Sequence, residues 1–429
     1  MNRPYIEGDF YIVGGLIMNL IEDLKWRGLL YQVTDDVIEQ KLINEELVFY
    51  LGADPTANSL HVGHLLAYLV AKRLMDYGHK PILLIGGGTG LVGDPSFKKS
   101  ERKLLTIEES LKNGEGITKQ VRRILPNAQI VNNYDWISSL NAIEFLRDVG
   151  KNFNVSYMMN KDSVKSRIEN GISFTEFAYQ ILQAWDFEYL YSNFNCQLQI
   201  GGQDQWGNIT SGLELIRKIH TVEANAYGIT FPLVTKSDGT KFGKTESGTL
   251  WLDKEKTSPY EFYQYWINAS DSDVIMRLKQ FTFLSREKIE ELEQEVKEKP
   301  EQRTAQKVLA EEITKLVHGE AELTKAMRVT EALFSGDIRD LDVEEIEMGF
   351  KHLQSVTIEE DLALVDGLIE LNLVKSKREA REMISNNAVS VNGEKVNDLD
   401  FVLKKAEAFG NKYTILRKGK KRYAVILHK

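Results

Sequence analysis

Two short polar stretches of the sequence carry residue types that bind phosphate. The first, "PTANSLHVGHL" at residues 55–65, places His61 and His64 on either side of Gly63. Imidazoles donate hydrogen bonds to phosphate oxygens, and a glycine at a helix start lets the backbone approach a ligand. The second, "KFGKT" at residues 241–245, adds two lysine ammonium groups. Together they predict a site for the phosphates of a nucleotide, although histidines at this spacing are more often structural when they stand alone.

Single residues argue against three other kinds of site. A Walker A loop that used the "GKT" of KFGKT needs a glycine at position 238, which is Asp238. Residues 88–93 fit G-x-G-x-x-G, but Pro95 follows closely and disrupts the helix that a dinucleotide-binding loop opens. The two histidines have no third metal ligand near them in the sequence, and the chain has no C-x-x-C pair. We therefore expect no metal site.

Apolar runs alternate with helical patterns from about residue 47 to 220, as in a parallel α/β sheet. The clearest predicted strands are "LVFYLG", "PILLIG" and "CQLQIGG", at residues 47–52, 81–86 and 196–202. Each ends in glycine and is followed by polar residues or more glycine. Because open α/β sheets bind ligands at the carboxyl ends of their strands, we expect the active site at these three strand ends.

The sequence changes character after the predicted sheet. Charged, periodic stretches such as "SREKIEELEQEVKEK" predict a helical domain, and the acidic, weakly periodic stretch after it is interpreted as a linker. We therefore expect a catalytic domain in residues 1–247, a helical domain in 248–334, a linker in 335–360 and a small α+β domain in 361–429. Residues 1–17 precede a better domain start at Met18 and are interpreted as an N-terminal extension or an upstream start.

The last segment has the features of a module that binds a phosphate backbone. From residue 361 onward it carries 14 Lys and Arg against 9 Asp and Glu, whereas the whole chain has a net charge of -9. Ser376 and Glu379 predict a capping box that opens a helix, and Asn392-Gly393 predicts a hairpin turn. Three cations share one exposed side of that helix: Lys377, Arg378 and Arg381. They suit contacts with a phosphate backbone, and an idle solvated surface is the alternative on charge alone.

The composition is that of a globular protein from a reducing compartment. Hydrophobic residues make up 42% of the 429 positions, which is enough for buried cores. The single cysteine, Cys196, cannot form an internal disulfide, and there is no apolar run of about 18 residues. We therefore expect no membrane association and a cytoplasmic location.

Several longer stretches of the sequence resemble those of one protein family and occur in the same order. "PTANSLHVGH" and "KFGKT" resemble the HIGH and KMSKS motifs of class I aminoacyl-tRNA synthetases, although KFGKT departs from KMSKS at its second, third and fifth positions and keeps only the two lysines. With "DLKWRGLLYQVTD", "GDPSFKKSER", "SFTEFAYQILQAWDF" and "GGQDQWGNI" in the same order, the chain resembles the bacterial tyrosyl-tRNA synthetases from about Met18 to its C-terminus. The resemblance implies a Rossmann-like parallel-sheet catalytic domain, a helical domain at the anticodon region of tRNA, and an S-four-like RNA-binding domain.

The same resemblance assigns roles to individual residues. Tyr50 and Asp186 would bind the hydroxyl of a substrate tyrosine, since a buried phenol needs a donor and an acceptor. The amino-acid end would be held by Asp94, Tyr179, Gln183 and Gln205. The adenylate and phosphates would be bound by Gly52, Asp54, Thr56, Gly63, Asp204 and Lys244, and the catalytic groups would be His61, His64, Lys241, Lys244 and Thr245. Core packing is the alternative for a lone tyrosine, and helix capping is the alternative for Asp204.

The activity implied by the resemblance is that of a tyrosine–tRNA ligase. The tyrosine carboxylate would attack the α-phosphate of ATP with loss of pyrophosphate, and the tyrosyl group would then pass to the terminal ribose of tRNA(Tyr). ATP is a substrate, Mg²⁺ is expected with it, and no tightly bound cofactor is expected. The resemblance also implies a homodimer. The alternatives are a tryptophanyl-type synthetase, another HxGH nucleotidyltransferase and a non-catalytic RNA-binding protein.

Overall fold

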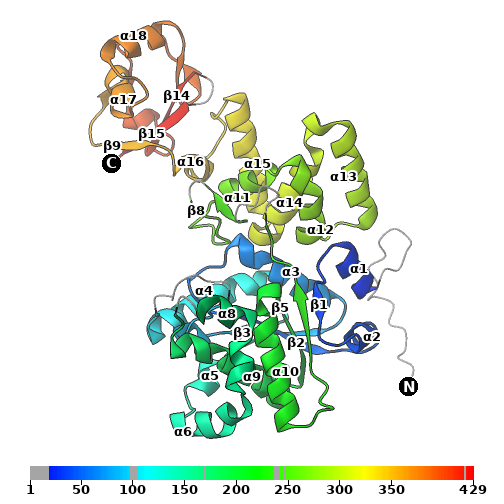
Figure 1. Ribbon diagram of the computed structural model, residues 1–429. Coiled ribbons are helices and arrows are strands. Elements are labelled where there is room, and N and C mark those ends of the chain that lie inside the picture. The colour runs from blue at the N-terminus through cyan, green and yellow to red at the C-terminus, as the bar shows by residue number, and fades with distance from the viewer. Residues whose placement is uncertain (1–18, 97–103, 169–170, 236–241, 246–247, 420–421) are drawn as a thin grey trace. The chain divides into compact units, whose positions relative to one another are not determined.

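In the computed structural model the chain forms two compact units (Figure 1). The first consists of Met1–Asp253 with Ala269–Ala305, and the second of Lys254–Asn268 with Gln306–Lys429. The structure describes residues 19–96, 104–168, 171–235, 242–245, 248–419 and 422–429. Within these ranges, no helix is both long and apolar enough to cross a membrane.

A six-stranded sheet forms the centre of the first unit. Its strand order is β1-β6-β5-β2-β3-β4, and every neighbouring pair is parallel except β1 and β6. The strands are β1 (Gln32–Val33), β2 (Val48–Ala53), β3 (Lys80–Ile85), β4 (Gln129–Asn132), β5 (Cys196–Gly202) and β6 (Tyr227–Phe231). The predicted α/β class is confirmed, and β2, β3 and β5 occupy the three stretches that were the clearest predicted strands.

Helices cover the sheet and bury its apolar strands. All of β6 and nearly all of β3 is buried, as expected for parallel strands in the middle of a layered fold. Phe187 and Leu213, from two helices that pack side by side along β5, share one buried cluster with Ile82 of β3 (Figure 1). The main covering helices are α3 (Val62–Asp76), α4 (Ile107–Ile124), α9 (Phe174–Phe194) and α10 (Trp206–Ile219).

The strand order changes direction beside β2. From β2 the chain runs through β3 to β4 on one side, and it then returns to the other side of β2 to form β5 and β6. The helices that leave β2 and β5 therefore depart in different directions, which opens a crevice at the carboxyl ends of these two strands. This is the position at which the sequence places the predicted site.

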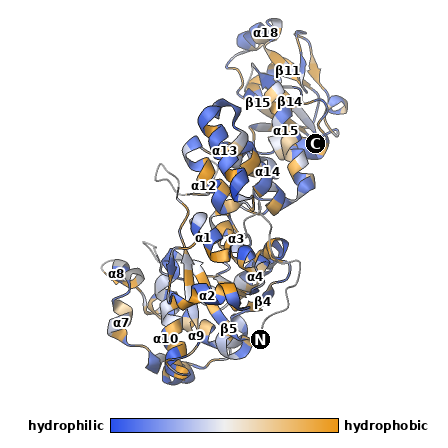
Figure 2. Ribbon diagram, turned by 90° about the vertical axis from the view of Figure 1, so that its right-hand side faces the viewer, coloured by the Kyte–Doolittle hydropathy of each residue, from blue (hydrophilic) through white to orange (hydrophobic). Residues whose placement is uncertain are grey.

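Shorter helices complete the first unit. They are α1 (Leu20–Trp26), α2 (Val37–Asn44), α5 (Tyr134–Ile137), α6 (Ala142–Glu144), α7 (Val155–Met159), α8 (Asp162–Ile168), α12 (Asp271–Phe281) and α13 (Arg286–Glu298). Helix α13 is mostly hydrophilic along its length, and only Ile289 and Leu292 of it are buried (Figure 2). It therefore contacts the rest of its unit along one narrow stripe.

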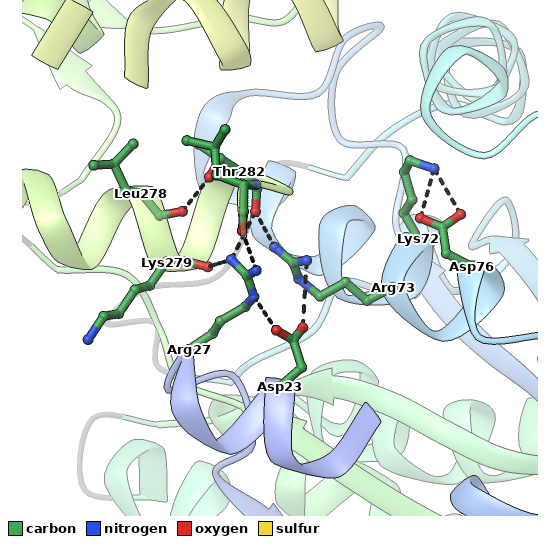
Figure 3. Close-up of polar contacts among 9 residues, drawn as sticks. Asp23, Arg27, Lys72, Arg73, Asp76, Leu278, Lys279 and Thr282 are labelled. Atoms are coloured by element: carbon green, nitrogen blue, oxygen red, sulfur yellow. Dashed lines mark hydrogen bonds and ion pairs between the residues drawn. The ribbon is translucent and has the colours of Figure 1, made fainter. Parts of the chain in front are cut away.

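A buried cluster of charges joins α1, α3 and α12 (Figure 3). Arg27 donates at 2.7–3.2 Å to three carbonyl oxygens at the end of α12: Lys279, Thr282 and Leu284. Arg73 of α3 also donates to the Thr282 carbonyl. Asp23 accepts from Arg27 at 2.6 Å and lies 3.8 Å from Arg73. The last carbonyls of a helix lack intrahelical partners, so these arginines fix the end of α12 to α1 and α3.

The second unit combines helices with a small sheet. Its helices are α11 (Pro259–Ile267), α14 (Thr304–His318), α15 (Glu320–Ser335), α16 (Val343–Phe350), α17 (Leu364–Glu370) and α18 (Lys377–Ser385). The sheet has the order β12-β11-β14-β15-β9, in which only β15 and β9 are parallel. Its strands are β9 (Ser355–Ile358), β11 (Val389–Val391), β12 (Glu394–Lys395), β14 (Tyr413–Lys418) and β15 (Arg422–His428), beside the short pair β10 (Leu362–Ala363) and β13 (Val402–Leu403).

The helix and hairpin predicted in this unit are both present. Asn392 and Gly393 have φ angles of 49° and 89°, the left-handed values that a type I′ turn requires. Ser376 caps α18 by accepting from Glu379 N at 3.2 Å. The Glu379 carboxylate accepts from Lys375 N instead of Ser376 N, so only half of the predicted capping box forms.

Residues 335–360 are more ordered than the predicted linker. They contain α16, which Asp342 and Glu345 cap reciprocally, and β9, which extends the small sheet. Ile346 and Phe350 of α16 are buried with Ile415 of the sheet. The other face of the sheet packs on α17 and α18. The expected linker therefore supplies part of a core, and its acidic composition concealed a helix of eight residues, too short to show a clear period.

Candidate active site

A cavity of about 270 Å³ lies at the carboxyl ends of β2, β3 and β5. It lies where the strand order changes direction, as open α/β sheets predict. Its lining includes most of the residues to which the resemblance gives a substrate-binding role: Tyr50, Gly52, Asp54, Thr56, Gly63, His64, Asp94, Tyr179, Gln183, Asp186, Asp204 and Gln205. The fold thus brings together residues from five separate stretches of the sequence.

His61 and His64 cap the first turn of α3. Gly63 N donates to His61 Nδ1 at 3.0 Å, and His61 N donates to His64 Nδ1 at 3.4 Å. Because each Nδ1 accepts a backbone N–H, a neutral ring carries its proton on Nε2, the tautomer that can donate to an anion at the helix N-terminus. His64 lines the cavity, while His61 forms an isolated β-bridge with Trp251.

The KFGKT stretch meets the start of α3. Leu250 donates to Gly243 O at 2.9 Å, and its own carbonyl accepts from Val62 N at 2.9 Å. A Cβ on Gly243 would lie 2.5 Å from Val62 Cγ1, and the φ of 76° at this position also favours glycine. The two predicted parts of the phosphate site therefore lie side by side in the fold.

The structure describes the side chain of neither lysine in KFGKT. Lys241 lies outside the described residues. Lys244 and Thr245 form β7 (Lys244–Thr245), which pairs with β8 (Gly248–Thr249), and the structure describes only their backbone. Their catalytic roles stay predictions.

Phe242 anchors KFGKT to α12. Its ring stacks on Phe281, with the centroids 5.4 Å apart, and the guanidinium of Arg277 lies 4.8 Å from its centroid. Arg277 also donates to the carbonyl oxygen of Thr235. Sequence patterns gave no signal of this contact, because a phenylalanine inside a polar loop does not reveal which helix receives it.

Asp186 and Tyr50 line the same cavity. Asp186 is 1% exposed, and its Oδ1 and Oδ2 accept from Trp136 Nε1 at 2.9 Å and Asn133 Nδ2 at 2.8 Å. Burial raises the pKa of Asp186 to about 8, while these two bonds act in the opposite direction. The buried Tyr50 hydroxyl has no hydrogen-bond partner among the described residues. Burial, and then the charge of Asp186, raises the pKa of Tyr50 well above its ordinary value, so this hydroxyl remains a donor.

Carboxylates and amides gather elsewhere in the cavity. Tyr179 OH donates to Asp54 Oδ2 at 2.9 Å. Gln205 Nε2 donates to Asp94 Oδ2 at 2.8 Å and to Asp204 Oδ2 at 3.3 Å. Burial raises the pKa of Asp204 from its ordinary value. Acceptors held in this way can receive the hydrogens of an ammonium group or of ribose hydroxyls.

The same carboxylates do not form a metal cage. In the part of the chain that the structure describes, no three His, Cys, Asp or Glu side chains gather as a ligand set. Three of the carboxylates already accept from Tyr179 or Gln205. The acidic groups therefore suit hydrogen-bond donors better than a resident divalent cation.

Three site residues escaped the sequence analysis: Thr89, Asn133 and Trp136. Asn133 and Trp136 hold the two oxygens of Asp186, and Thr89 Oγ1 donates to Asp54 Oδ1 at 2.7 Å. Thr89 lies inside the glycine-rich stretch that fits G-x-G-x-x-G. That pattern specifies only the glycines, so it gives no role to the hydroxyl between them. Asn133 and Trp136 directly follow β4, and the rule of polar residues after strand ends would have found them if β4 had been predicted.

The predicted tRNA-binding cations lie on one side of α18. Lys377, Arg378 and Arg381 are exposed, while Ala380 and Ile384 on the other side are buried. Lys377 also pairs with Asp366 at 2.6 Å. Arg378 and Arg381 are thus the better candidates for contacts with a phosphate backbone.

The parallel sheet, the crevice at its change of strand order and the histidine-capped helix are features of class I aminoacyl-tRNA synthetases. The family described as "tRNA synthetases class I (W and Y)" matches residues 41–335, which is more than half of the chain. The family described as "Tyrosine--tRNA ligase SYY-like C-terminal domain" matches residues 345–426. The resemblance inferred from the motifs is therefore confirmed.

Two relatives of the chain are tyrosine–tRNA ligases. The chain is 58% identical over 417 residues to tyrosine–tRNA ligases of Geobacillus stearothermophilus and Bacillus caldotenax, which covers 95% of this chain and 99% of each relative. It therefore belongs to the tyrosine–tRNA ligase family. A solved C-terminally truncated mitochondrial tyrosyl-tRNA synthetase of Aspergillus nidulans is 31% identical, with a TM-score of 0.66 over 75% of this chain and 95% of that one. The tryptophanyl and other nucleotidyltransferase alternatives are not supported.

Proposed function

We propose that the chain activates L-tyrosine with ATP, forming tyrosyl-adenylate and pyrophosphate, and then transfers the tyrosyl group to tRNA(Tyr). The observation that carries this proposal is the unpartnered, buried Tyr50 hydroxyl in the same cavity as Asp186. A ligand phenol would accept from Tyr50 and donate to the Asp186 carboxylate. Phenylalanine offers neither bond and would leave both groups unpaired. The tyrosine–tRNA ligase relatives support the same substrate.

The amino-acid backbone of the substrate would lie among the cavity's polar groups. Asp94 and Tyr179 would face the ammonium group, because a carboxylate and a phenol oxygen are acceptors for its hydrogens. The Oε1 atom of Gln183 is buried without a partner among the described residues, so it is a further acceptor. These contacts would leave the substrate carboxylate directed toward the start of α3.

Activation needs positioning and charge stabilisation, but no covalent enzyme intermediate. A carboxylate oxygen of tyrosine forms a bond to the α-phosphorus of ATP, and the bond from that phosphorus to the bridging oxygen breaks as pyrophosphate leaves. His61 and His64 would donate from Nε2 to phosphate oxygens, and Lys241, Lys244 and Thr245 would bind the leaving group. Gly52, Thr56 and Gly63 would let the nucleotide approach the backbone, and Asp204 would accept from the ribose. Mg²⁺ would arrive with ATP as part of the substrate.

The second step would use the second unit to bind tRNA(Tyr). The terminal ribose hydroxyl would attack the tyrosyl carbonyl carbon, and AMP would leave. Arg378 and Arg381 would contact phosphates of the tRNA backbone, which carry no sequence information but fix the register of the complex. We place this activity in the cytoplasm.

We also propose that the protein acts as a homodimer. Five apolar side chains within residues 143–174 are exposed: Ile143, Leu146, Val155, Tyr157 and Phe174. Phe174 has the largest exposed fraction of the five, at 75%. Exposed apolar groups favour a protein interface over contact with water, and a second copy of the chain would cover them. Sedimentation of the Phe174→Asp variant as a monomer, beside a dimeric parent, would support this; an unchanged dimer would exclude this surface.

Tyrosine-dependent exchange of pyrophosphate into ATP, measured with each amino acid in turn, tests the proposed activity. We expect exchange with tyrosine and little with phenylalanine or tryptophan. The variant Tyr50→Phe keeps the ring and removes only the donor, so it should raise the KM for tyrosine about tenfold. Exchange that required tryptophan, or that occurred with no amino acid, would contradict the proposal.

A further inference from the structure

We propose that Thr89 is a positioning residue that couples the two ends of the amino-acid site. The proposal rests on the proposed function. The Thr89 hydroxyl donates to Asp54 Oδ1 at 2.7 Å and accepts from Asn133 Nδ2 at 2.9 Å. Asn133 Nδ2 also donates to Asp186 Oδ2 at 2.8 Å. One continuous chain of hydrogen bonds therefore joins the carboxyl group for the phenol to a carboxylate at the opposite, polar end of the site.

The direction of each bond in this chain is fixed. Asn133 Oδ1 accepts from Gly88 N at 2.7 Å, so the amide cannot flip without placing its own N–H groups against another donor. Both Nδ2 hydrogens therefore point toward Thr89 and Asp186. Since Thr89 Oγ1 already accepts from Asn133, its single hydrogen is directed to Asp54. Thr89 therefore has no hydrogen left for a ligand, and its hydroxyl orients its two neighbours.

Burial and close packing hold the chain in place. Asn133 is 0% exposed and Thr89 is 3% exposed. A Cβ on Gly86 would lie 2.1 Å from Asp54 Oδ1 and 2.5 Å from Thr89 Oγ1, so the glycine leaves the space in which this bond forms. Water competes poorly in such surroundings, and each bond is stronger than it would be at the surface.

The arrangement makes Thr89 important for tyrosine because its hydroxyl orients Asp54. Asp54 Oδ2 accepts from Tyr179 OH, and its Oδ1 accepts from Thr89. Loss of the Thr89 hydroxyl would release Asp54 from one side and leave one Asn133 hydrogen without an acceptor. The phenol end and the polar end would then lose their orientation together.

The variant Thr89→Val removes the hydroxyl and keeps the branched shape. In pyrophosphate exchange we expect its KM for tyrosine to rise about tenfold, and its preference for tyrosine over phenylalanine to fall by a similar factor. Thr89→Ser, which keeps the hydroxyl, should restore the tyrosine KM. If Thr89→Val does not accumulate as folded protein, Thr89→Ala provides the same test.

Thr230 of strand β6 provides a matched control. It is 1% exposed and its hydroxyl has no partner among the described residues, so Thr230→Val should leave the tyrosine KM unchanged. Equal effects of Thr89→Val and Thr230→Val would overturn the proposal. A normal tyrosine KM in Thr89→Val, with a fully active parent, would also overturn it. Absence of tyrosine-dependent exchange in the parent would instead overturn the proposed function.

A double-mutant cycle with Tyr179→Phe tests the route through Asp54. Both substitutions remove a donor to the same carboxylate, so their combined effect on the tyrosine KM should be smaller than the product of the single effects. If the tyrosine KM of the double variant rises by the full product of the two single effects, Thr89 does not act through Asp54 and the proposed coupling is wrong.

Discussion

The imidazole rings of His61 and His64 lie stacked at the start of α3, with their centroids 3.8 Å apart and their planes inclined by 23°. Each ring also accepts a backbone N–H of the same turn. The two histidines therefore fix one another's position before any nucleotide arrives. Preorganisation of this kind lets a donor stabilise charge in the transition state without first having to reorient.

Replacement of His64 should affect chemistry more than tyrosine binding. We expect His64→Ala to lower the rate of tyrosyl-adenylate formation by about 10²-fold, as when one preorganised donor is removed from a transition state. The dissociation constant for tyrosine, measured by equilibrium dialysis without ATP, should change little. A large loss of tyrosine affinity with normal adenylate formation would contradict the assigned role.

Tyrosine binding should depend on pH through Asp186. The pKa of this carboxyl is about 8 in the free protein, and a phenol donates a stronger, charge-assisted hydrogen bond to its ionised form. Affinity should therefore rise as the pH approaches 8, by at most about tenfold per unit below that value, and then level off. The parent should show this profile in calorimetric titrations, Tyr50→Phe should keep it with weaker binding, and Asp186→Asn should lose it.

The free energy of unfolding of the unliganded protein should fall over the pH range in which tyrosine affinity rises. Between the ordinary pKa of an aspartate and about 8, the folded state keeps a proton on Asp186 that the unfolded chain releases. Stability of the unliganded parent therefore falls as the pH rises through this window, and bound tyrosine offsets the loss.

Gly243→Ala should disturb the junction between KFGKT and α3. The added Cβ meets Val62 at 2.5 Å and the φ of 76° is unfavourable for alanine, at a combined cost of about 1–3 kcal/mol. We expect a rise of about tenfold or more in the KM for ATP, with tyrosine affinity unchanged. Gly248→Ala is the matched control, because its φ is 119° but no heavy atom lies within 4 Å of the new Cβ. Equal effects of both variants would indicate backbone strain alone.

The charge cluster around Asp23 should matter for stability. Asp23→Asn would leave Arg27 and Arg73 close together in a buried setting without their carboxylate, and we expect a loss of about 3 kcal/mol. Asp76→Asn is the control: it breaks the 2.9 Å pair with Lys72 on the same helix α3, whose more exposed partners should contribute about 1 kcal/mol or less. The midpoint of thermal unfolding distinguishes the two. Similar shifts would show that the cluster has no special role.

Arg378→Ala combined with Arg381→Ala should weaken tRNA charging without changing pyrophosphate exchange. If both guanidinium groups contact phosphates, the salt dependence of tRNA binding should become shallower by about two in its logarithmic slope. Lys288→Ala, which removes an exposed cation from α13, should leave both measurements unchanged. This test is preferable to deletion of residues 361–429, which would expose the core shared by α15, α16 and the small sheet.

The sequence predicted what depends on local pattern. Apolar runs that end in glycine predicted β2, β3 and β5, and Asn392-Gly393 predicted a hairpin. Buried strands and left-handed turns each require particular residue types within a few positions, so a short stretch of sequence is enough to indicate them. The cavity contains residues that the motifs had singled out, such as Asp54 and His64. In each case the signal and the structure lie in the same short stretch.

The remaining features depend on contacts between distant stretches. Thr89, Asn133 and Asp186 are far apart in the sequence. No hydrophobic periodicity or sequence motif predicts that their side chains will be joined by hydrogen bonds. The contact between the Phe242 ring and the Arg277 guanidinium depends on the position of α12 in the fold, which the sequence around Phe242 does not specify. Helix α16 differs from these cases: Asp342 and Glu345 form a capping signal in the sequence, but the acidic residues around it are equally typical of a linker.

The attachment of α12 to α1 and α3 has a consequence for biosynthesis. Arg27 and Arg73 find their acceptors at Leu284 and Thr282, which follow them by 257 and 209 residues. At ordinary elongation rates the ribosome needs on the order of ten seconds or more to make that stretch. Until then the two cations lack these carbonyl acceptors, so the first unit cannot complete its core while α12 is still unmade. A nascent chain would thus acquire its nucleotide crevice and its final rigidity at different times.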